Sequence, residues 1–407
     1  MSPSYTVTSR TGYGSRLWNS VKAIGTGFLL LIWSIILLWW NENNFVEQKA
    51  ALEETEGQTI EVSADKIDAA NDKSAVYINW KTSSPDENPL VDEVFWIKTD
   101  DLKLIRNVEM YQWKEEEHTE TEDNLWWSQT TRTTYTYDKV WSDEHIDSSR
   151  FYKPEYSNPD WKYDWETYVK DPILLWAFTL SSEFVAKLTD KVAVSLSGQE
   201  ITPISWMKIL DSLLYIGNDP KEPEIWDLKI TFYRVPAWAA SAVGQQYGEN
   251  LKPFMTSNKR SISLLEQDNV TVNELFAHAH SANLTMTWIL RIVGFLLLWI
   301  AFSMIFSILE TLAKVVPFIA DIIWAATWIV TFCLALIVWI VTIAIAWLAV
   351  RPIYWIIALV AVIGIIAWMI YMKKKNPRQE LSSSEDKKDS HKEEPKQDSS
   401  ESEIIEA

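Results

Sequence analysis

Uncharged hydrophobic runs separate the membrane-spanning parts of the chain from the aqueous parts. The first run, at 24–40, reads "IGTGFLLLIWSIILLWW". At a rise of about 1.5 Å per residue it nearly crosses about 30 Å of hydrocarbon. It leads into Asn41 rather than into a small-residue cleavage site, which indicates a retained helix and not a signal peptide. We therefore predict a transmembrane helix at 23–40.

Three more hydrophobic runs lie near the C-terminus, at 286–306, 317–350 and 353–372. The middle run is too long for one upright span, so its first turns are expected to lie at the interface or to kink after Pro317. We predict transmembrane helices at 286–306, 326–350 and 353–372, with a cytoplasmic-side loop and interfacial helix at 307–325. The dipeptide Arg351-Pro352 is expected to form a tight connection between the last two.

Basic residues indicate the orientation of these helices. The segment 1–22 contains Arg10, Arg16 and Lys22 and no acidic residue, and Lys373 to Lys375 follow the last run. Because positively charged flanks stay in the cytoplasm, both termini are predicted to be cytoplasmic and 41–285 to be exported. The membrane would be the cell inner membrane in a prokaryote, and the endoplasmic reticulum or inner nuclear membrane in a eukaryote.

The C-terminal tail, 373–407, is rich in Ser, Lys, Asp and Glu and has hardly an aromatic residue. It cannot bury enough apolar surface to fold, so we predict a disordered cytoplasmic tail. Its initial cluster, Lys373 to Lys375, is expected to bind anionic lipid.

The exported segment 41–285 alternates between apolar and polar residues, a pattern typical of strands. Examples are "SAVYINW" at 74–80, "TTRTTYTY" at 130–137 and "LKITFYRV" at 228–235. Helical spacing interrupts this pattern in "SSEFVAKL" from Ser181 and in "ISWMKILDSLL" from Ile204. The mixture predicts a β-rich α+β domain.

A capping box, "TVNE", begins at Thr271 and predicts the start of another helix. Leu275, Ala279, Ala282 and Met286 then form one stripe, so we expect an interfacial amphipathic helix that leads into the second span.

The stretch "NVEMYQWKEEEH" at 107–118 sets apolar and aromatic residues directly against three glutamates. Apolar residues occur on both faces, as in a strand that is covered on each side, and the run at 130–137 is expected to pair with it in a long hairpin with a solvated acidic tip. The aromatic residues are expected to be core, and binding of a cation or partner at the tip is the alternative. The candidate interaction or structural residues are Glu109, Tyr111, Trp113, Glu115, Glu116 and Glu117.

Charge and missing motifs narrow the function. The exported segment has 43 acidic and 23 basic residues, a net charge of −20, so a nucleic-acid partner is disfavoured. The only cysteine, Cys333, lies within a predicted span, which leaves no thiol or disulfide chemistry in the domain. No nucleotide-binding, serine-hydrolase or zinc-protease motif occurs, and His278 and His280 point apart on a helix. We predict no catalytic site, metal or cofactor, although abundant carboxylates leave a glycosidase-like pair open.

Charged residues in or near the predicted spans form a second set of candidates, because a charge in hydrocarbon is costly. Arg291 lies one turn into its span and is expected to reach back to the exported face. Asp321 is expected to pack inside the three-helix group, with an ion pathway as the alternative. Arg351 completes this set.

The chain resembles the transmembrane protein 43 family, also called LUMA, over nearly its whole length. The resemblance rests mainly on "VEMYQW" at 108–113, and also on "WNE" at 40–42, the "YxYxxxW" strand at 135–141, "NP" at 158–159 and "WDLK" at 226–229. This chain reads "WNENNFV" where members commonly read "WNEGRAV", and it adds a low-complexity tail. The resemblance implies a four-span protein that organises other membrane proteins and has no enzymatic activity.

The predicted architecture is a membrane α-helical protein with one helix before, and three helices after, a large β-rich exported domain. The predicted function is a non-catalytic multi-pass scaffold that organises membrane protein or lipid-associated complexes and that can form homo-oligomers through small residues in the spans. The alternative is a channel or transporter accessory subunit that uses the charged residues of the three-helix group.

Overall fold

The computed structural model describes residues 3–123, 128–313, 317–349, 360 and 363–372. The chain divides into two compact units, Met1–Ile343 and Ala344–Ala407, and the contacts below lie within the first. The predicted disordered tail, 373–407, and residues 353–359 and 361–362 of the fourth predicted span lie outside the described residues. Of that span, Ile363–Met372 forms a short apolar helix.

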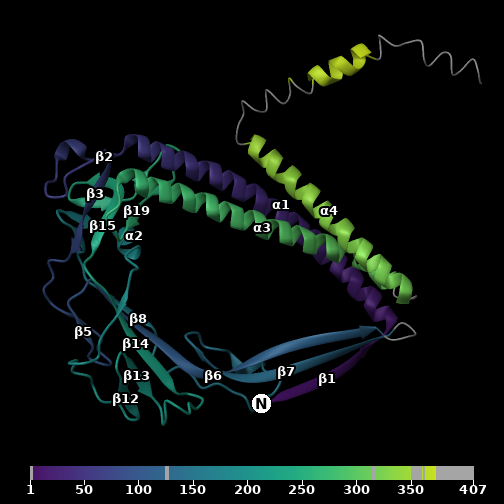
Figure 1. Cartoon of the computed structure of the whole chain (residues 1–407), viewed down its shortest axis with the longest axis horizontal. Helices are drawn as coiled ribbons and strands as arrows, with labels where there is room; N and C mark the ends of the chain where they lie inside the picture. Colours follow the sequence, from purple (N-terminus) through teal and green to yellow (C-terminus); the bar gives the residue numbers. More distant parts are fainter. Residues whose placement is uncertain (1–2, 124–127, 314–316, 350–359, 361–362, 373–407) are drawn as a thin grey trace, which may run out of the picture. The chain divides into compact units, whose positions relative to one another are not determined.

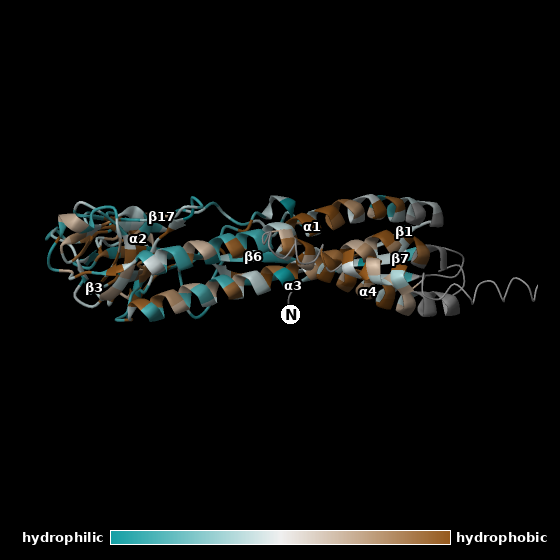
Figure 2. Cartoon of the chain, turned by 90° about the horizontal axis from the view of Figure 1, so that it is seen from above, coloured by the Kyte–Doolittle hydropathy of each residue, from teal (hydrophilic) through white to brown (hydrophobic). Residues whose placement is uncertain are grey.

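Long helices carry the hydrophobic runs. They are α1 (Tyr13–Gln58), α3 (Val272–Ala313) and α4 (Pro317–Ala349). Within the described residues these three are long and apolar enough to cross a membrane. α1 has 46 residues, about 70 Å of helix, so it exceeds the predicted span at both ends. Figure 2 shows the hydropathy changing along α1 and α3, from more hydrophilic at the end toward β3 and α2 to hydrophobic at the opposite end.

α1 and α3 pack side by side in opposite directions (Figure 1). Small residues allow the close approach, because a Cβ on Gly27 would come within 2.9 Å of the carbonyl oxygen of Ala301. A Cβ on Gly294 would lie 2.7 Å from Cγ of Leu38, which is fully buried. Leu38, Leu298 and Ala335 form the buried centre where α4 joins this pair.

Two large antiparallel sheets form the domain between α1 and α3. The order of the first, in the described residues, is β1 (Ser4–Thr11), β7 (Gln129–Ser142), β6 (Lys103–Asp123), β14 (Leu228–Val235), β13 (Leu213–Ile216) and β12 (Met207–Leu210), with β8 (Glu166–Val169) on β6 and β11 (Val192–Ala193) on β14. The order of the second is β19 (Leu264–Glu266), β15 (Ala239–Tyr247), β16 (Asn250–Lys252), β10 (Phe178–Leu180), β9 (Leu174–Leu175), β3 (Ala75–Ser83) and β2 (Ile60–Glu61), with parallel pairing of β10 with β16 and β2 with β3. β15 also pairs with β3.

Smaller elements complete the domain: the two-stranded ladders β4 (Leu90–Val91) with β5 (Lys98–Thr99) and β17 (Phe254–Met255) with β18 (Ser261–Ile262), the short helix α2 (Ser182–Ala186), and the 3-10 turns η1 (Ala69–Asn71) and η2 (Ser148–Arg150). The helix predicted from "SSEFVAKL" is thus confirmed as α2.

Each large sheet has its own hydrophobic core, and strand alternation builds both. In β14, Leu228, Ile230 and Phe232 are buried, as their spacing predicts. In β6, Val108 and Met110 enter the same core. A third cluster joins the sheets to the long helices, because α1 contributes Ala51 and Leu52 and α3 contributes Leu275 and Phe276, packed against Tyr77 and Val243 of the second sheet. The domain is therefore packed directly onto α1 and α3.

One prediction from helical spacing is wrong. The run at 204–214 is not a helix, because β12 and β13 pair with Leu210 opposite Leu213 across a two-residue turn. Asp211 in that turn has a φ of 48°, and β13 pairs onto β14, so sheet packing outweighs a short helical pattern.

The helix predicted from the capping box at Thr271 continues into the second hydrophobic run as one helix, α3. Its first part packs on the domain through Leu275, whereas Ala282 and Met286 of the predicted stripe are exposed. Its position at the membrane interface stays a prediction.

The N-terminal segment forms a strand with the exported domain. β1 pairs with β7 over eight residues, from Ser4 opposite Thr136 to Thr11 opposite Gln129. A ladder forms only between strands in one aqueous compartment. The topology predicted from the basic residues places 1–22 in the cytoplasm and 41–285 outside. The pairing of β1 with β7 is incompatible with that topology.

Candidate functional site

A buried ion pair joins α1 to α3 at the end of the first hydrophobic run. Nε and Nη2 of Arg291 donate to the two carboxylate oxygens of Glu42 at 2.6 and 2.8 Å. The side chain of Glu42 is fully buried and that of Arg291 is 14% exposed. Arg291 thus lies in a two-pronged pair with its neighbour helix, beside the end of the first hydrophobic run, and its approach to the exported face stays a prediction.

Polar groups around this pair fix all three long helices. Asn41 donates its amide to the carbonyl oxygen of Thr287 at 3.1 Å, and the indole of Trp339 in α4 donates to the carbonyl oxygen of Arg291 at 2.9 Å. The guanidinium of Arg291 lies 4.8 Å from the ring centroid of Trp288. The arrangement holds the helices in one register and contains no open position for a reactant.

A second clamp lies further along α1, where the β17–β18 hairpin contacts the helix. Arg260 donates to Glu47 at 2.7 Å and to the amide oxygen of Asn44 at 2.8 Å. The hydroxyl of Ser257 donates to Glu54 at 2.6 Å. The hydrogen bond from Arg260 lowers the pKa of Glu47, and the hydrogen bonds from Ser257 lower the pKa of Glu54. The domain is thus tied to α1 by charge as well as by packing.

The hairpin predicted from "NVEMYQWKEEEH" is confirmed, but the acidic residues belong to its strands. β6 and β7 pair from Met110 opposite Ser142 to Asp123 opposite Gln129. Glu116 and Glu117 are exposed on this ladder, as expected, and Glu116 accepts from Lys114 at 2.7 Å.

The aromatic residues of β6 pack on its neighbours. The ring centroid of Tyr111 lies 5.0 Å from that of Trp141, and that of Trp113 lies 4.8 Å from that of Tyr156. Both side chains are half-buried, as is Glu109. The two aromatic side chains therefore contribute to packing, but they lie outside the buried core in which they were predicted.

Glu115 joins the hairpin to the segment that follows β7 through hydrogen bonds. It accepts from the hydroxyl of Tyr137 and from the backbone N–H of Tyr152 at 2.7 Å. Burial raises the pKa of Tyr137, and the hydrogen bond to Glu115 raises it further. The hydrogen bond between the hydroxyls of Tyr156 and Tyr5 of β1, with burial, raises the pKa of Tyr156 to about 12. These phenols stay neutral and hold structure.

The remaining predicted candidates fall at the edge of the described chain. Asp321 belongs to α4, but its side chain lies outside the described residues. Arg351 lies outside them altogether.

A long connection from β7 to β8 covers the base of the hairpin. Asn158 accepts from the N–H of Trp113 at 2.7 Å and donates to its carbonyl oxygen at 2.9 Å. Gln112, fully buried, donates to the carbonyl oxygen of Glu144 at 2.9 Å and accepts from the N–H of Ile146 at 2.9 Å. These bonds attach the connection to the "VEMYQW" strand, so its surface is positioned by β6.

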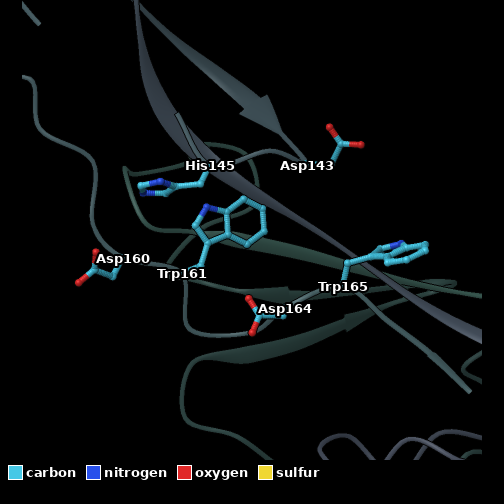
Figure 3. A pocket seen from close by; sticks show the side chains of 6 residues that line it. All are labelled: Asp143, His145, Asp160, Trp161, Asp164 and Trp165. Atoms are coloured by element: carbon cyan, nitrogen blue, oxygen red, sulfur yellow. The ribbon is translucent and has the colours of Figure 1, made fainter. Parts of the chain in front are cut away.

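This connection forms an open cavity of about 540 Å³, which we call the acidic–aromatic pocket. Figure 3 shows Trp161 in the middle of the lining side chains, which are Asp143, His145, Asp160, Trp161, Asp164 and Trp165. No lysine or arginine lines it. Its volume falls within the range of about 300–1,000 Å³ typical of ligand pockets. The sequence signal is "DWKYDW" at 160–165, which sequence reasoning missed.

Metal-ligating clusters and shifted pKa values are the remaining chemical features of a possible site. No three His, Cys, Asp or Glu side chains among them are grouped as metal ligands. The strongest pKa shifts belong to tyrosines such as Tyr215, where burial and the hydrogen bond to Asp227 raise the pKa. Asp227 is fully buried, so this is a structural pair of the "WDLK" segment.

Comparisons with known proteins identify related chains. A family model described as Transmembrane protein 43 matches residues 110–352. Transmembrane protein 43 of Homo sapiens is 27% identical over 364 residues, which cover 85% of this chain and 89% of the human one. The protein of Mus musculus is 26% identical over 88% of this chain and 90% of its own, and the homolog of Drosophila melanogaster is 26% identical over 80% and 88%. No solved structure matches.

Proposed function

The chain belongs to the transmembrane protein 43 family, and on this basis we propose that it is a non-catalytic scaffold of the membrane. It is an integral membrane protein with several apolar helices and a large strand-rich domain between the first and the second of them. The proposed role is to hold other membrane proteins, or lipid-associated complexes, at the surface of the strand-rich domain. Its relatives are named as transmembrane proteins and not as enzymes.

The observation that carries this proposal is the continuity between membrane helices and domain. α1 and α3 run unbroken from their hydrophobic parts into the domain, and Glu42 and Arg291 fix their register. Beyond this pair, the cluster of Leu52 with Phe276 and the clamp at Arg260 attach the sheets to the same helices. A surface attached in this way keeps one orientation, which suits a protein that positions partners.

The charge of the domain indicates the partners. With a net charge of −20 on 41–285, its contacts favour basic proteins and disfavour nucleic acid. Self-association through the lipid-facing helices and binding of anionic lipid at Lys373 to Lys375 are further parts of the proposal, and those lysines lie outside the described residues.

The alternative predicted from the sequence, a channel or transporter accessory, needs Arg291 and Asp321 to face a shared polar path. The pairing of Arg291 with Glu42 accounts for that charge within the helix pair and counts against this alternative.

Site-specific crosslinking in native membranes tests the scaffold. A photoreactive residue at Tyr152, which is 47% exposed on the domain, is compared with one at Ile32, which is 54% exposed on the hydrophobic part of α1. The expected result is a defined set of other proteins captured from Tyr152 and not from Ile32. Capture of nothing but further copies of the chain would contradict the proposal.

A further inference from the structure

We propose that the acidic–aromatic pocket binds a lysine or arginine side chain presented by an extended segment of a partner protein. The inference rests on the proposed scaffold function and names the class of partner. Its basis is the combination of a cavity, unpaired carboxylates and indole rings in the lining.

The carboxylates give the pocket its charge. Within the described residues, the side chains of Asp143, Asp160 and Asp164 make no ion pair or hydrogen bond; Asp164 is engaged only through its carbonyl oxygen, which accepts from Arg106 at 2.9 Å. Three unpaired carboxylates around one cavity attract a cation and repel an anion. They are not grouped as ligands of a metal ion, so a larger organic cation fits them better.

The indole rings add a surface suited to such a cation. Trp165 is 59% exposed at the pocket, and Trp161 lies in its centre (Figure 3). The face of an indole attracts an ammonium or guanidinium group through its quadrupole. The chain shows this contact elsewhere, where Nζ of Lys229 lies 4.0 Å from the ring centroid of Trp141.

The openness of the cavity favours a side chain that a longer chain presents. Asp143, Asp160 and Asp164 are all exposed, so a cationic side chain can enter the cavity while the backbone that carries it stays at the surface. The Nε1 atom of Trp161 is buried and has no hydrogen-bond partner, but it is not accessible from the cavity and takes no part in this binding. A partner protein held by the proposed scaffold supplies such a side chain.

The position of the pocket supports a role in the scaffold. Asn158 and Gln112 hold the lining segment against β6, so the pocket keeps a fixed place on the domain. Among the described residues, the ring of His145 makes no hydrogen bond with a carboxylate of the pocket. Its Nε2 lies 3.3 Å from the carbonyl oxygen of Pro159. The negative charge of the lining is thus available to a ligand.

A binding experiment with the full-length protein in nanodiscs tests the proposal. The probe is a fluorescently labelled peptide, Gly-Gly-Arg-Gly-Gly, and its neutral counterpart carries citrulline in place of arginine. The variant D160N/D164N removes two charges from exposed positions of the pocket. A matched variant, E120Q/E122Q, removes two charges from exposed positions of β6 outside it. Thermal unfolding of each variant confirms that it is folded.

We expect D160N/D164N to weaken arginine-peptide binding about tenfold, and W165A to weaken it by about the same factor. E120Q/E122Q should change it less than about twofold, and the citrulline peptide should bind the wild-type protein at least about tenfold more weakly. Equal losses of arginine-peptide affinity in D160N/D164N and E120Q/E122Q, or equal affinity of the wild-type protein for the two peptides, would overturn the proposal that this pocket binds the cation. Binding of methylguanidinium as tight as that of the arginine peptide would overturn the peptide assignment.

The outcome is separable from that of the scaffold proposal. Partners captured from Tyr152 with no arginine-peptide binding leave the scaffold and reject this pocket. Arginine-peptide binding with no captured partner supports the pocket and rejects the scaffold.

Discussion

The sharpest prediction concerns the ion pair between Glu42 and Arg291. Glu42→Met replaces the carboxylate with an apolar side chain of similar volume and leaves the guanidinium, 14% exposed, without its two hydrogen bonds. Removing one partner of a buried ion pair costs about 3–5 kcal/mol. Because Arg291 keeps its contact with Trp288 and some access to solvent, we expect a loss of about 3 kcal/mol in the free energy of unfolding.

Arg291→Met should cost a similar amount, because it leaves Glu42 buried and unpaired. The free energy of unfolding of the double variant E42M/R291M should lie within about 1 kcal/mol of that of the wild-type protein, because two apolar side chains of similar volume pack together and leave no charge unpaired. The free energies of unfolding are measured in bicelles by steric trapping, and the four proteins form a double-mutant cycle. The expected coupling energy is about 4 kcal/mol or more, well above the usual range of about 0.5–3 kcal/mol, because each single variant strands a charge.

The matched control is the pair of Lys49 with Glu53 on the same helix. Its Nζ–Oε1 distance is 3.6 Å and its side chains are 45% and 58% exposed. Such a pair contributes about 0.5 kcal/mol or less. A coupling energy between Glu42 and Arg291 no larger than that of this control would refute the reasoning that the pair fixes α1 to α3.

Three further predictions follow from the fold. The double variant T6C/T134C, in a background free of the native cysteine, should form an intramolecular disulfide that is detected as a gel shift. The reason is that Thr6 and Thr134 are directly opposite in the ladder and their hydroxyl oxygens are 3.1 Å apart. Free thiols at both positions would instead support the topology predicted from the basic residues. Gly244→Ala should lose about 2 kcal/mol of unfolding free energy, because the new Cβ would lie 2.7 Å from the backbone oxygen of Lys252; a thermal unfolding curve equal to wild type would contradict this. Glu47→Gln should lose about 0.5 kcal/mol at pH 7. The pKa of Glu47 is lowered from 4.5 in the folded state, so its contribution to stability is present above pH 4.5 and disappears as the pH falls through the folded-state pKa. The free energies of unfolding of the variant and the wild-type protein should therefore become equal in acid. A difference that stays constant with pH would argue against the ion pair.

The sequence by itself determined the hydrophobic helices, the strand-rich character of the domain and the hairpin at β6 and β7. These features depend on local pattern: a run without charge needs lipid, and a period of two places Leu228, Ile230 and Phe232 on one face wherever the strand lies. The same reasoning failed at 204–214. There a short apolar run has no decisive period, and pairing of β13 with β14 chose the strand.

The tertiary structure alone decided which distant residues meet. Glu42 and Arg291 are separated by 249 positions, and no local pattern in either segment names the other. The pairing of β1 with β7 is likewise not visible in either segment. Nor is the hydrogen bond between Asn158 and Trp113, which positions the acidic–aromatic pocket. The physical reason is that the cost of burying a charge or a backbone group is set by its neighbours in space, and the chain must be folded before those neighbours exist.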